Sequence, residues 1–254
     1  IGVDLTDRLS VGATVSLGSA NFDAPFQGLG ASVLAYSLRG SLGANYQLGC
    51  NTYLGAMWHT SQNFNFDDAI RLQLPLGFTE VTDVNAGLPA NYGLGIANDA
   101  LMNGRLLLAA DVMFKQWEKA DLFDVLYQNQ WVLQLGAQFD VNERYRLRAG
   151  YVYAENPLDM TVAGSAGGII PPVNAEAALQ YTQATVALAN HHRMTVGAGI
   201  RDIMPGVDLD LFAGYMFSAS ENLGDFTATD VKSYWMGGGL TWHFGRRCQH
   251  NDCN

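Results

Sequence analysis

Residues 144–153 read RYRLRAGYVY, and residues 131–139, one short turn earlier, read WVLQLGAQF. In both stretches the large apolar side chains fall on odd positions, while arginine, glutamine and glycine fill most of the even ones. Successive side chains of a β-strand point to opposite faces of its sheet, so this period of two predicts strands with one apolar and one polar face. With only a short turn between them, the two strands are expected to pair as an antiparallel hairpin.

The same alternation recurs along the whole chain and predicts about ten strands. They cover residues 8–18, 37–48, 51–63, 86–98, 104–117, 127–140, 143–156, 191–202, 206–219 and 232–244. The predicted short turns are 49–50, 99–103, 141–142 and 203–205, and the long connections are 19–36, 64–85, 157–190 and 220–231. Short turns at one end and long loops at the other are typical of outer-membrane barrels.

The composition favours a barrel in lipid over a soluble β-sandwich. Charged residues make up 15% of the 254 residues and hydrophobic residues 48%, whereas soluble domains carry roughly 25% charged residues. A soluble sandwich would also carry many lysines and glutamates on its solvated face, but the polar faces here hold mainly Gly, Ser, Thr, Gln and Arg. We therefore predict an all-β fold, a transmembrane antiparallel β-barrel whose apolar stripes face the lipid of a bacterial outer membrane.

Residues 1–244 are predicted to form the barrel, and residues 245–254 a periplasmic tail. Outward-facing aromatic residues gather toward both strand ends, for example Tyr46 near a short turn and Phe114 near a long loop, as interfacial girdles require. Open sheet edges would leave backbone groups unbonded in lipid, so closure of the sheet is expected. Because the chain starts at Ile1, in what reads as the end of a strand, we expect further sequence upstream.

The charge balance and the scarcity of reactive clusters exclude two classes of function. A net charge of −10, from 24 acidic and 14 basic residues, argues against nucleic acid as a partner, because phosphate binding needs a basic face. No nucleophile, base and orienting group can be placed together: Asp208 and Asp210 fall near the short-turn end, and His191 and His192 near the opposite rim. We expect no enzymatic activity, no cofactor and no metal.

Several stretches, in a fixed order, carry a family resemblance. They are LP at 88–89, YGLG at 92–95, LAADV at 108–112, Trp117, LGAQF at 135–139, YRLRAGY at 145–151, NP at 156–157, VGAG at 196–199, the run 207–215 and the upstream piece 38–58. The chain resembles the outer-membrane long-chain fatty-acid transporter family, which also includes aromatic-hydrocarbon uptake channels.

The resemblance implies a barrel of 14 strands in the intact protein, with an N-terminal segment that plugs the lumen as a hatch. The hatch and about four strands would then lie upstream of this sequence, and so would the lateral opening of the family, which is therefore assigned to no residue here. Phe244 matches the aromatic residue that usually ends such barrels, although this chain continues to Asn254.

The predicted function is passive uptake of hydrophobic small molecules, such as long-chain fatty acids or hydrocarbons, through a plugged barrel. Its partners would be the hydrophobic ligand and outer-membrane lipid. Two alternatives stay open. The first is a scaffold or assembly subunit of a larger envelope complex, with envelope proteins as partners. The second is a general polar porin.

Charged residues of inward parity form the first candidate site: Asp111, Arg144, Arg146, Arg148, Arg193, Arg201, Asp208 and Asp210. They are interpreted either as a polar network that holds the plug and steers a carboxylate head group, or as the paired charges that fill wide barrels. Unpaired charges would be costly in such an interior.

Apolar residues of inward parity form the second candidate site: Met57, Met113, Trp117, Phe212, Met216 and Trp235. Apolar lumen groups are unusual in a water-filled porin and suit a greasy path, with methionine adapting to varied ligand shapes. The alternative is that these residues pack against the plug.

Two further predictions concern the loops and the tail. Ile169, Ile170 and Val173 make the loop 157–190 apolar, and it serves either to capture ligand outside or to pack over the barrel mouth. In the oxidising periplasm, Cys248 can pair with Cys253, or Cys50 with the tail. The number and spacing of these cysteines fall short of a zinc pattern.

Overall fold

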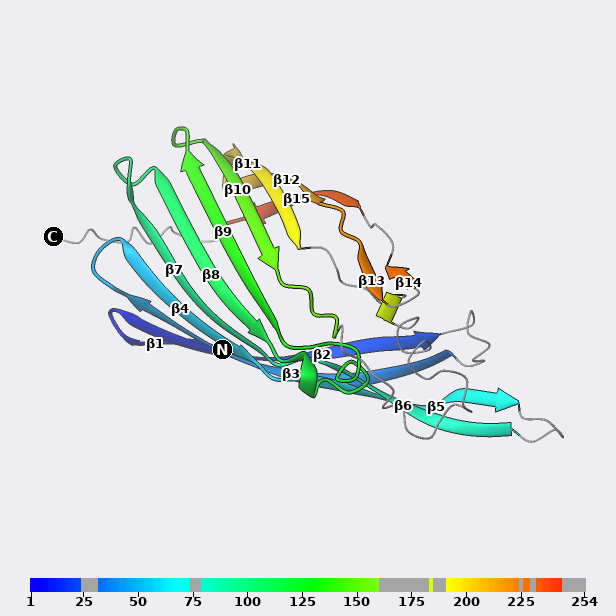
Figure 1. Cartoon of the computed structure of the whole chain (residues 1–254). Coiled ribbons are helices and arrows are strands. Elements are labelled where there is room, and N and C mark those ends of the chain that lie inside the picture. Colours follow the sequence, from blue (N-terminus) through cyan, green and yellow to red (C-terminus); the bar gives the residue numbers. More distant parts are fainter. Residues whose placement is uncertain are drawn as a thin grey trace.

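The computed structural model describes residues 1–23, 32–73, 79–159, 183–184, 191–223, 226–228 and 232–243. Eleven strands form one antiparallel sheet that curves into an open trough (Figure 1). In sheet order they are β1 (Gly2–Thr6), β2 (Leu9–Asp23), β3 (Ser32–Gln47), β4 (Thr52–His59), β7 (Asn91–Leu101), β8 (Leu106–Lys115), β9 (Gln130–Asp140), β10 (Tyr145–Ala154), β11 (His192–Met204), β12 (Val207–Met216) and β15 (Ser233–Trp242).

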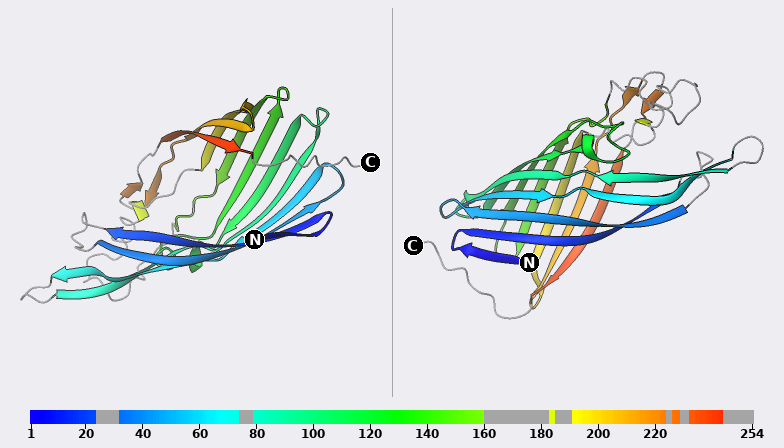
Figure 2. Two further views of the ribbon diagram at one scale, coloured as in Figure 1. Left: turned by 180° about the vertical axis from the view of Figure 1, so that it is seen from behind. Right: turned by 90° about the horizontal axis from the view of Figure 1, so that it is seen from below.

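Each of the ten predicted strands has a counterpart in this sheet, so the predicted all-β antiparallel class is confirmed. The eleventh strand, β1, pairs with β2 through Gly2 to Thr6. Within the described ranges β1 and β15 form the two edges of the sheet and are not paired with each other. Figure 2 shows the trough from behind and from below, with these two strands at its margins.

The predictions for two of the long connections are wrong. Residues 19–23 and 32–36 are strand, because β2 runs on to Asp23 and β3 begins at Ser32. Residues 64–73 and 79–85 belong to a separate hairpin of β5 (Gln62–Gln73) and β6 (Thr79–Leu88), which projects beyond the sheet (Figure 1). The hairpin forms because the alternating Asn-Phe pattern of 63–66 buries Phe64 and Phe66 against Ala35 and Val84.

The short turns all lie at one end of the sheet, as predicted, which we call the turn end. They span residues 7–8, 48–51, 102–105, 141–144 and 205–206. One of the two shortest joins β11 to β12 through Gly206, whose φ of +74° suits glycine best. The opposite end, called the loop end, carries β5–β6, a second small hairpin of β13 (Glu221–Leu223) and β14 (Phe226–Ala228), and the helical turn η3 (Trp117–Lys119).

The apolar side chains of the strands form an exposed stripe on one face of the sheet. Val15 is 76% exposed, Leu94 64% and Tyr234 80%, whereas monomeric proteins in water rarely leave large contiguous apolar patches uncovered. All three residues have the outward parity predicted from the sequence. A soluble sandwich would bury this face. The exposed stripe therefore supports contact with lipid and agrees with the predicted location in the bacterial outer membrane.

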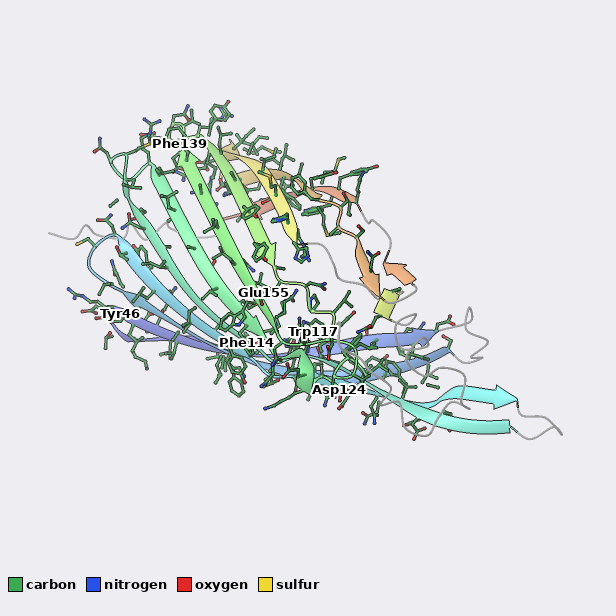
Figure 3. All side chains as sticks on the ribbon, viewed as in Figure 1. Tyr46, Phe114, Trp117, Asp124, Phe139 and Glu155 are labelled. Carbon is green, nitrogen blue, oxygen red and sulfur yellow. The ribbon has the colours of Figure 1, made fainter. Side chains whose placement is uncertain are left out.

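Aromatic residues of the outward face mark both ends of the sheet. Tyr46 and Phe139 lie at the turn end, and Phe114 lies at the loop end (Figure 3). At the loop end the Phe114 and Trp131 rings contact each other across neighbouring strands in a tilted arrangement, with ring centroids 4.9 Å apart. Such belts place amphipathic or aromatic rings at the two membrane interfaces. No helix among the described residues is both long and apolar enough to cross a membrane.

Candidate functional site

The face opposite the apolar stripe, called the inner face, includes two hollows lined by described residues that the sequence predicts to face the lumen. The larger one has a volume of about 700 Å³ and follows the middle of β2, β3, β4, β7 and β8. The smaller one has a volume of about 520 Å³ and lies across β9 to β12 and β15. Volumes of this size fall within the range of small-molecule pockets. The two hollows differ in which side chains surround them.

The larger hollow, named the glycine groove, exists because glycines occupy adjacent inner positions on neighbouring strands. One cross-strand row runs Gly12, Gly43, Met57, Gly93 and Met113. The next row, toward the turn end, runs Asn45, Gly55, Gly95, Asp111 and Gln134. Without side chains on the glycines the wall is thin, and the remaining side chains lie along it.

Met57 and Asp111 both lie flat over a facing glycine. A Cβ atom on Gly93 would come within 2.8 Å of the Met57 Cε atom, and one on Gly95 would overlap the Asp111 carboxylate. The predicted lumen residues Met57 and Met113 therefore line the groove together with Asp111. The groove also contains the His59 imidazole, whose Nδ1 lies 2.6 Å from the Ser41 hydroxyl.

The smaller hollow is lined by Phe212 and Trp235, two of the predicted apolar lumen residues. Each ring lies over an inner-face glycine of the neighbouring strand, Phe212 over Gly237 and Trp235 over Gly214. The rings therefore follow the wall and leave the space above it open. Replacing either glycine would push the ring away from the wall, because a Cβ atom would occupy its place.

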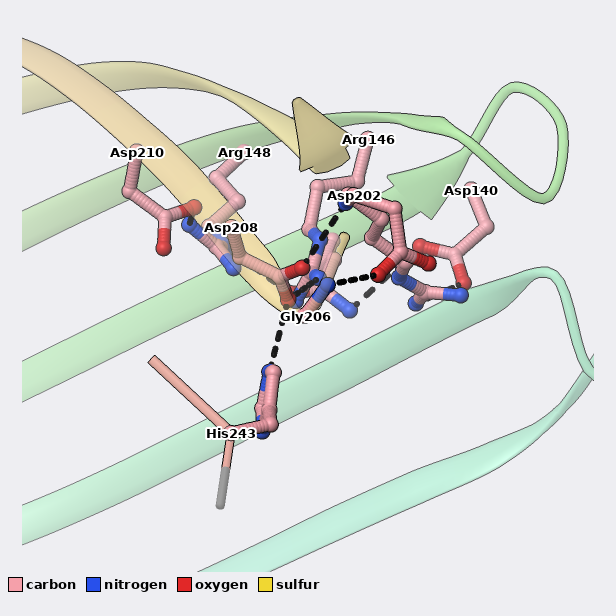
Figure 4. Close-up of polar contacts among 10 residues, drawn as sticks. Asp140, Arg146, Arg148, Asp202, Gly206, Asp208, Asp210 and His243 are labelled. Atoms are coloured by element: carbon pink, nitrogen blue, oxygen red, sulfur yellow. Dashed lines mark hydrogen bonds and ion pairs between the residues drawn. The ribbon is translucent and has the colours of Figure 1, made fainter. Parts of the chain in front are cut away.

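A network of ion pairs lies next to the smaller hollow, toward the turn end (Figure 4). Arg146 donates to Asp208 at 3.2 Å, and Arg201 donates to Asp140 at 2.7 Å. Asp208 also accepts a hydrogen bond from the Asp202 amide at 3.0 Å. The structure thus places Arg146, Arg201 and Asp208 in one network on the inner face.

The third pair of the network lies in the wall of the smaller hollow. Arg148 donates through Nη1 to Asp210 at 2.6 Å and through Nε to Gln138 at 2.8 Å. Each of the three arginines in the network thus faces a carboxylate. Their positive charges therefore have compensating carboxylates inside the wall.

Three predicted members lie outside this network. Arg144 belongs to the exposed turn before β10, with its guanidinium over the Tyr145 ring. Arg193 lies toward the loop end opposite Met216, and its buried Nε atom has no hydrogen-bond partner in the described part of the chain. Asp111 lies in the glycine groove, on the other side of the inner face.

The sequence reasoning missed four members of the network: Asp140, Gln138, Asp202 and His243. Asp140, Gln138 and His243 all have inward parity, so the signal was present in the alternation that identified their partners. Asp202 gave no such signal, because its φ of +48° belongs to an irregularity between Ile200 and Met204 that breaks the period of two.

Trp117 packs outside the lumen hollows, contrary to the prediction that it lines them. Strand β8 ends at Lys115, so the parity used for Trp117 no longer applies two residues later. The indole is buried in a cluster at the loop end, called the loop cluster, with Ala120, Leu126, Tyr127 and Leu158. Figure 3 shows Trp117 among the connecting segments near Asp124. Met216 also lies near the loop end and lines neither hollow.

The loop cluster ties three connecting segments together. The Gln183 amide is buried and donates to the Leu126 carbonyl at 2.9 Å and to the Asp159 carbonyl at 2.7 Å. The Gly87 amide of β6 donates to the Asp121 carbonyl at 2.8 Å. The segment after β8 is therefore fixed to the β5–β6 hairpin and to the connection after β10.

Tyr127 provides a pH test of this cluster. Burial raises the pKa of the Tyr127 phenol to about 12, against about 10 in an unfolded chain. The cluster should keep its full stability below pH 10 and lose it progressively as the pH rises from 10 to 12, because only the unfolded segment ionises in that interval. The ultraviolet difference titration of the wild type against Tyr127→Phe should show one phenol ionising near pH 12. A difference curve centred at pH 10 would contradict the buried position.

Several predicted residues lie outside the described residues, namely Ile169, Ile170, Val173, Phe244, Cys248 and Cys253. Their roles stay predictions. Cys50 is exposed in the turn between β3 and β4. Within the described ranges no group of three or more His, Cys, Asp or Glu side chains is placed to hold a metal ion.

Comparisons with known proteins identify the fold. No protein-family model and no curated protein sequence matches the chain. Among solved structures it is similar to the toluene transporter TodX of Pseudomonas putida, with 19% identity and a TM-score of 0.59 over 94% of this chain and 66% of TodX. A FadL homologue of Pseudomonas aeruginosa matches with 18% identity and a TM-score of 0.55 over 94% of this chain and 64% of the homologue.

A third similar structure is the monoaromatic hydrocarbon channel CymD, with 17% identity and a TM-score of 0.51 over 85% of this chain and 66% of CymD. The chain therefore has the fold of outer-membrane channels of the FadL type, and the predicted resemblance is confirmed at the level of fold. It spans about two thirds of the length of the structures it matches.

Proposed function

We propose that the protein forms an outer-membrane channel for the passive uptake of hydrophobic small molecules. A ligand would move along the inner face, in contact with Met57, Met113, Phe212 and Trp235, and no chemistry or cofactor would be involved. The channel wall would be completed by further strands, with a plug inside it, and residues 245–254 would form a periplasmic tail.

The observation that carries the proposal is the character of the inner face. A general polar porin needs a water-filled interior lined by polar groups. Here the two hollows are lined mainly by glycine, alanine, aliphatic, thioether and aromatic residues, with polar residues in the minority. The arginines beside the smaller hollow are neutralised by Asp140, Asp208 and Asp210. Such a surface offers contact to apolar molecules and little to sugars.

Uptake into proteoliposomes tests the proposal, with toluene and sucrose as the two probes. We expect the protein to accelerate the entry of toluene and to leave sucrose entry at the level of empty vesicles. Equal acceleration of both probes would identify a general porin. No acceleration of either would contradict a transport function and favour a scaffold in a larger envelope complex.

A blocked groove provides the matched variant. At Gly43 a Cβ atom would meet only the Ala56 carbonyl oxygen, at 3.8 Å, so Gly43→Phe should fold and fill the glycine groove with a ring. We expect toluene entry to fall about tenfold, since a filled pocket excludes the ligand. Gly239→Phe is the control, because Gly239 shares the inner face, has open space above it and lines neither hollow. An equal loss in both variants would remove the groove from the path.

A further inference from the structure

The glycine groove contains a carboxylate that the uptake of hydrocarbons does not explain. We propose that Asp111 makes the groove selective for uncharged hydrophobic molecules that carry a hydroxyl donor, such as phenols, and that it rejects hydrophobic carboxylates. The inference rests on the proposed function of the same inner face and names the class of substrate that this part of the face accepts.

The position of Asp111 suits a recognition role. In the sheet Asp111 lies between Gly95 and Gln134 of the neighbouring strands. Its carboxylate lies over Gly95, and the residue lines the groove. The adjacent cross-strand row presents the thioethers of Met57 and Met113. A ring placed over Gly93 would contact these thioethers while a substituent reached Asp111. Sulfur–aromatic contacts are favourable and tolerate rings of different shapes.

Asp111 differs in its partners from the aspartates of the ion-pair network. Asp140, Asp208 and Asp210 each accept a hydrogen bond from an arginine. In the described part of the chain the exposed Asp111 carboxylate has neither an ion pair nor a hydrogen bond within the usual distances. Its negative charge is therefore not compensated by the wall and acts on whatever enters the groove.

Among the residues that the structure describes, the charged side chains lining the groove have one sign. This lining includes the acidic residues Asp4 and Asp111 and the His59 imidazole, and no lysine or arginine side chain. Arg39 lies on the same strand as Asn45, but its guanidinium is directed to the Thr60 and Pro89 carbonyl oxygens at 3.1 Å and 3.0 Å, and it does not line the groove.

The chemistry of the ligand follows from these charges. A carboxylate in the groove would face Asp111 without a neutralising cation among the described residues, and like charges at short range repel each other. A hydroxyl group would instead donate a charge-assisted hydrogen bond to the Asp111 carboxylate, which is shorter and stronger than a neutral one. An unsubstituted hydrocarbon would gain only the apolar contacts, so it would bind between the two.

Three probes with the same ring and methyl group test the inference: p-cresol, toluene and 4-methylbenzoate, which is anionic at neutral pH. Their affinities are measured by equilibrium dialysis against the detergent-solubilised, full-length protein. We expect p-cresol to bind about tenfold more tightly than 4-methylbenzoate, the equivalent of one charge-assisted hydrogen bond gained or one repulsion relieved.

Asp111→Asn should bring the two affinities to within about twofold, mainly by strengthening the binding of 4-methylbenzoate. Asp111→Glu keeps the charge and should keep the preference. The control Asp121→Asn removes the same charge from an exposed side chain at the loop end and should leave the preference unchanged.

The outcomes separate this inference from the function on which it rests. Equal affinities for p-cresol and 4-methylbenzoate in the wild type, or a preference that survives in Asp111→Asn, would overturn the selectivity and leave the uptake of hydrophobic molecules intact. If none of the three probes bound, the proposed function and the selectivity would both be overturned.

Discussion

Replacing Asp208 by alanine is expected to destabilise the folded protein by about 3–5 kcal/mol, because it leaves the Arg146 guanidinium in the wall without its partner. The side chains of Asp208 and Arg146 are only 10% and 16% exposed. Asp208 also accepts from the Asp202 amide and lies 3.3 Å from the His243 Nε2 atom, so three elements lose a contact at once. The measurement is the urea midpoint of unfolding in lipid vesicles. The folded fraction at each urea concentration is read from the gel mobility of unheated samples.

Asp210→Ala is the matched comparison. Its pair with Arg148 is shorter, at 2.6 Å against 3.2 Å, but about a third exposed, at 32% and 35% for the two side chains. Water compensates such groups, so the expected loss is below about 1 kcal/mol. The double variant Asp208→Leu, Arg146→Leu should recover part of the stability lost in Asp208→Ala, because no charge is left unpaired. Equal losses for Asp208→Ala and Asp210→Ala would show that the Asp208 cluster is not buried in the membrane-embedded protein.

The second large effect concerns the apolar stripe. Leu135 lies in the middle of β9 on the outward face and is 45% exposed. If this face contacts lipid, Leu135→Arg should cost about 2–4 kcal/mol, because an arginine at the bilayer midplane must be desolvated. The same urea titration in vesicles measures the loss.

Its control is the next residue along the strand. Gln134 lies on the inner face opposite Asp111, so Gln134→Arg places the new guanidinium beside a carboxylate. We expect a change of less than about 1 kcal/mol. A larger stability loss for Gln134→Arg than for Leu135→Arg would indicate that the inner face is the core of a soluble sandwich. Equal tolerance of both substitutions would contradict a lipid-facing stripe.

The alternation of side chains was sufficient to predict the wall of the barrel. In β9 and β10 each apolar residue of odd number faces outward, and the arginines of even number meet aspartates from β12, two strands away. Parity identifies the face of a residue, but it does not identify which inner-face charges are close enough to pair. For that reason Asp111 was grouped with a network to which it does not belong.

The period of two fails where the chain leaves the sheet or changes its geometry. Trp117 follows the last residue of β8 and enters a helical turn, so its direction is set by the loop cluster. Asp202 lies at an irregularity with positive φ, and its amide reaches Asp208 through local geometry. The β5–β6 hairpin carries the alternating pattern, but its segment is long and rich in polar residues, and these features also fit a long connection.

The glycines of the inner face became meaningful only when strands were paired. In the sequence, Gly93 and Gly95 are two small residues of inward parity. In the sheet they lie opposite Met57 and Met113, and opposite Gly55 and Asp111. The hollow is a property of neighbouring strands and their register, which a single strand does not reveal.

The order of the sheet follows the order of the chain, except that β5–β6 and β13–β14 stand apart as excursions between neighbours. Apart from these two hairpins, each strand of the sheet pairs with the strands that precede and follow it in the chain. The search for contacts therefore stays local during assembly. A wall with this plan can grow or shrink by whole hairpins over evolutionary time, because each added pair brings its own register with its turn. The two hairpins at the loop end can then vary in length and sequence, while the strands of the sheet keep their register.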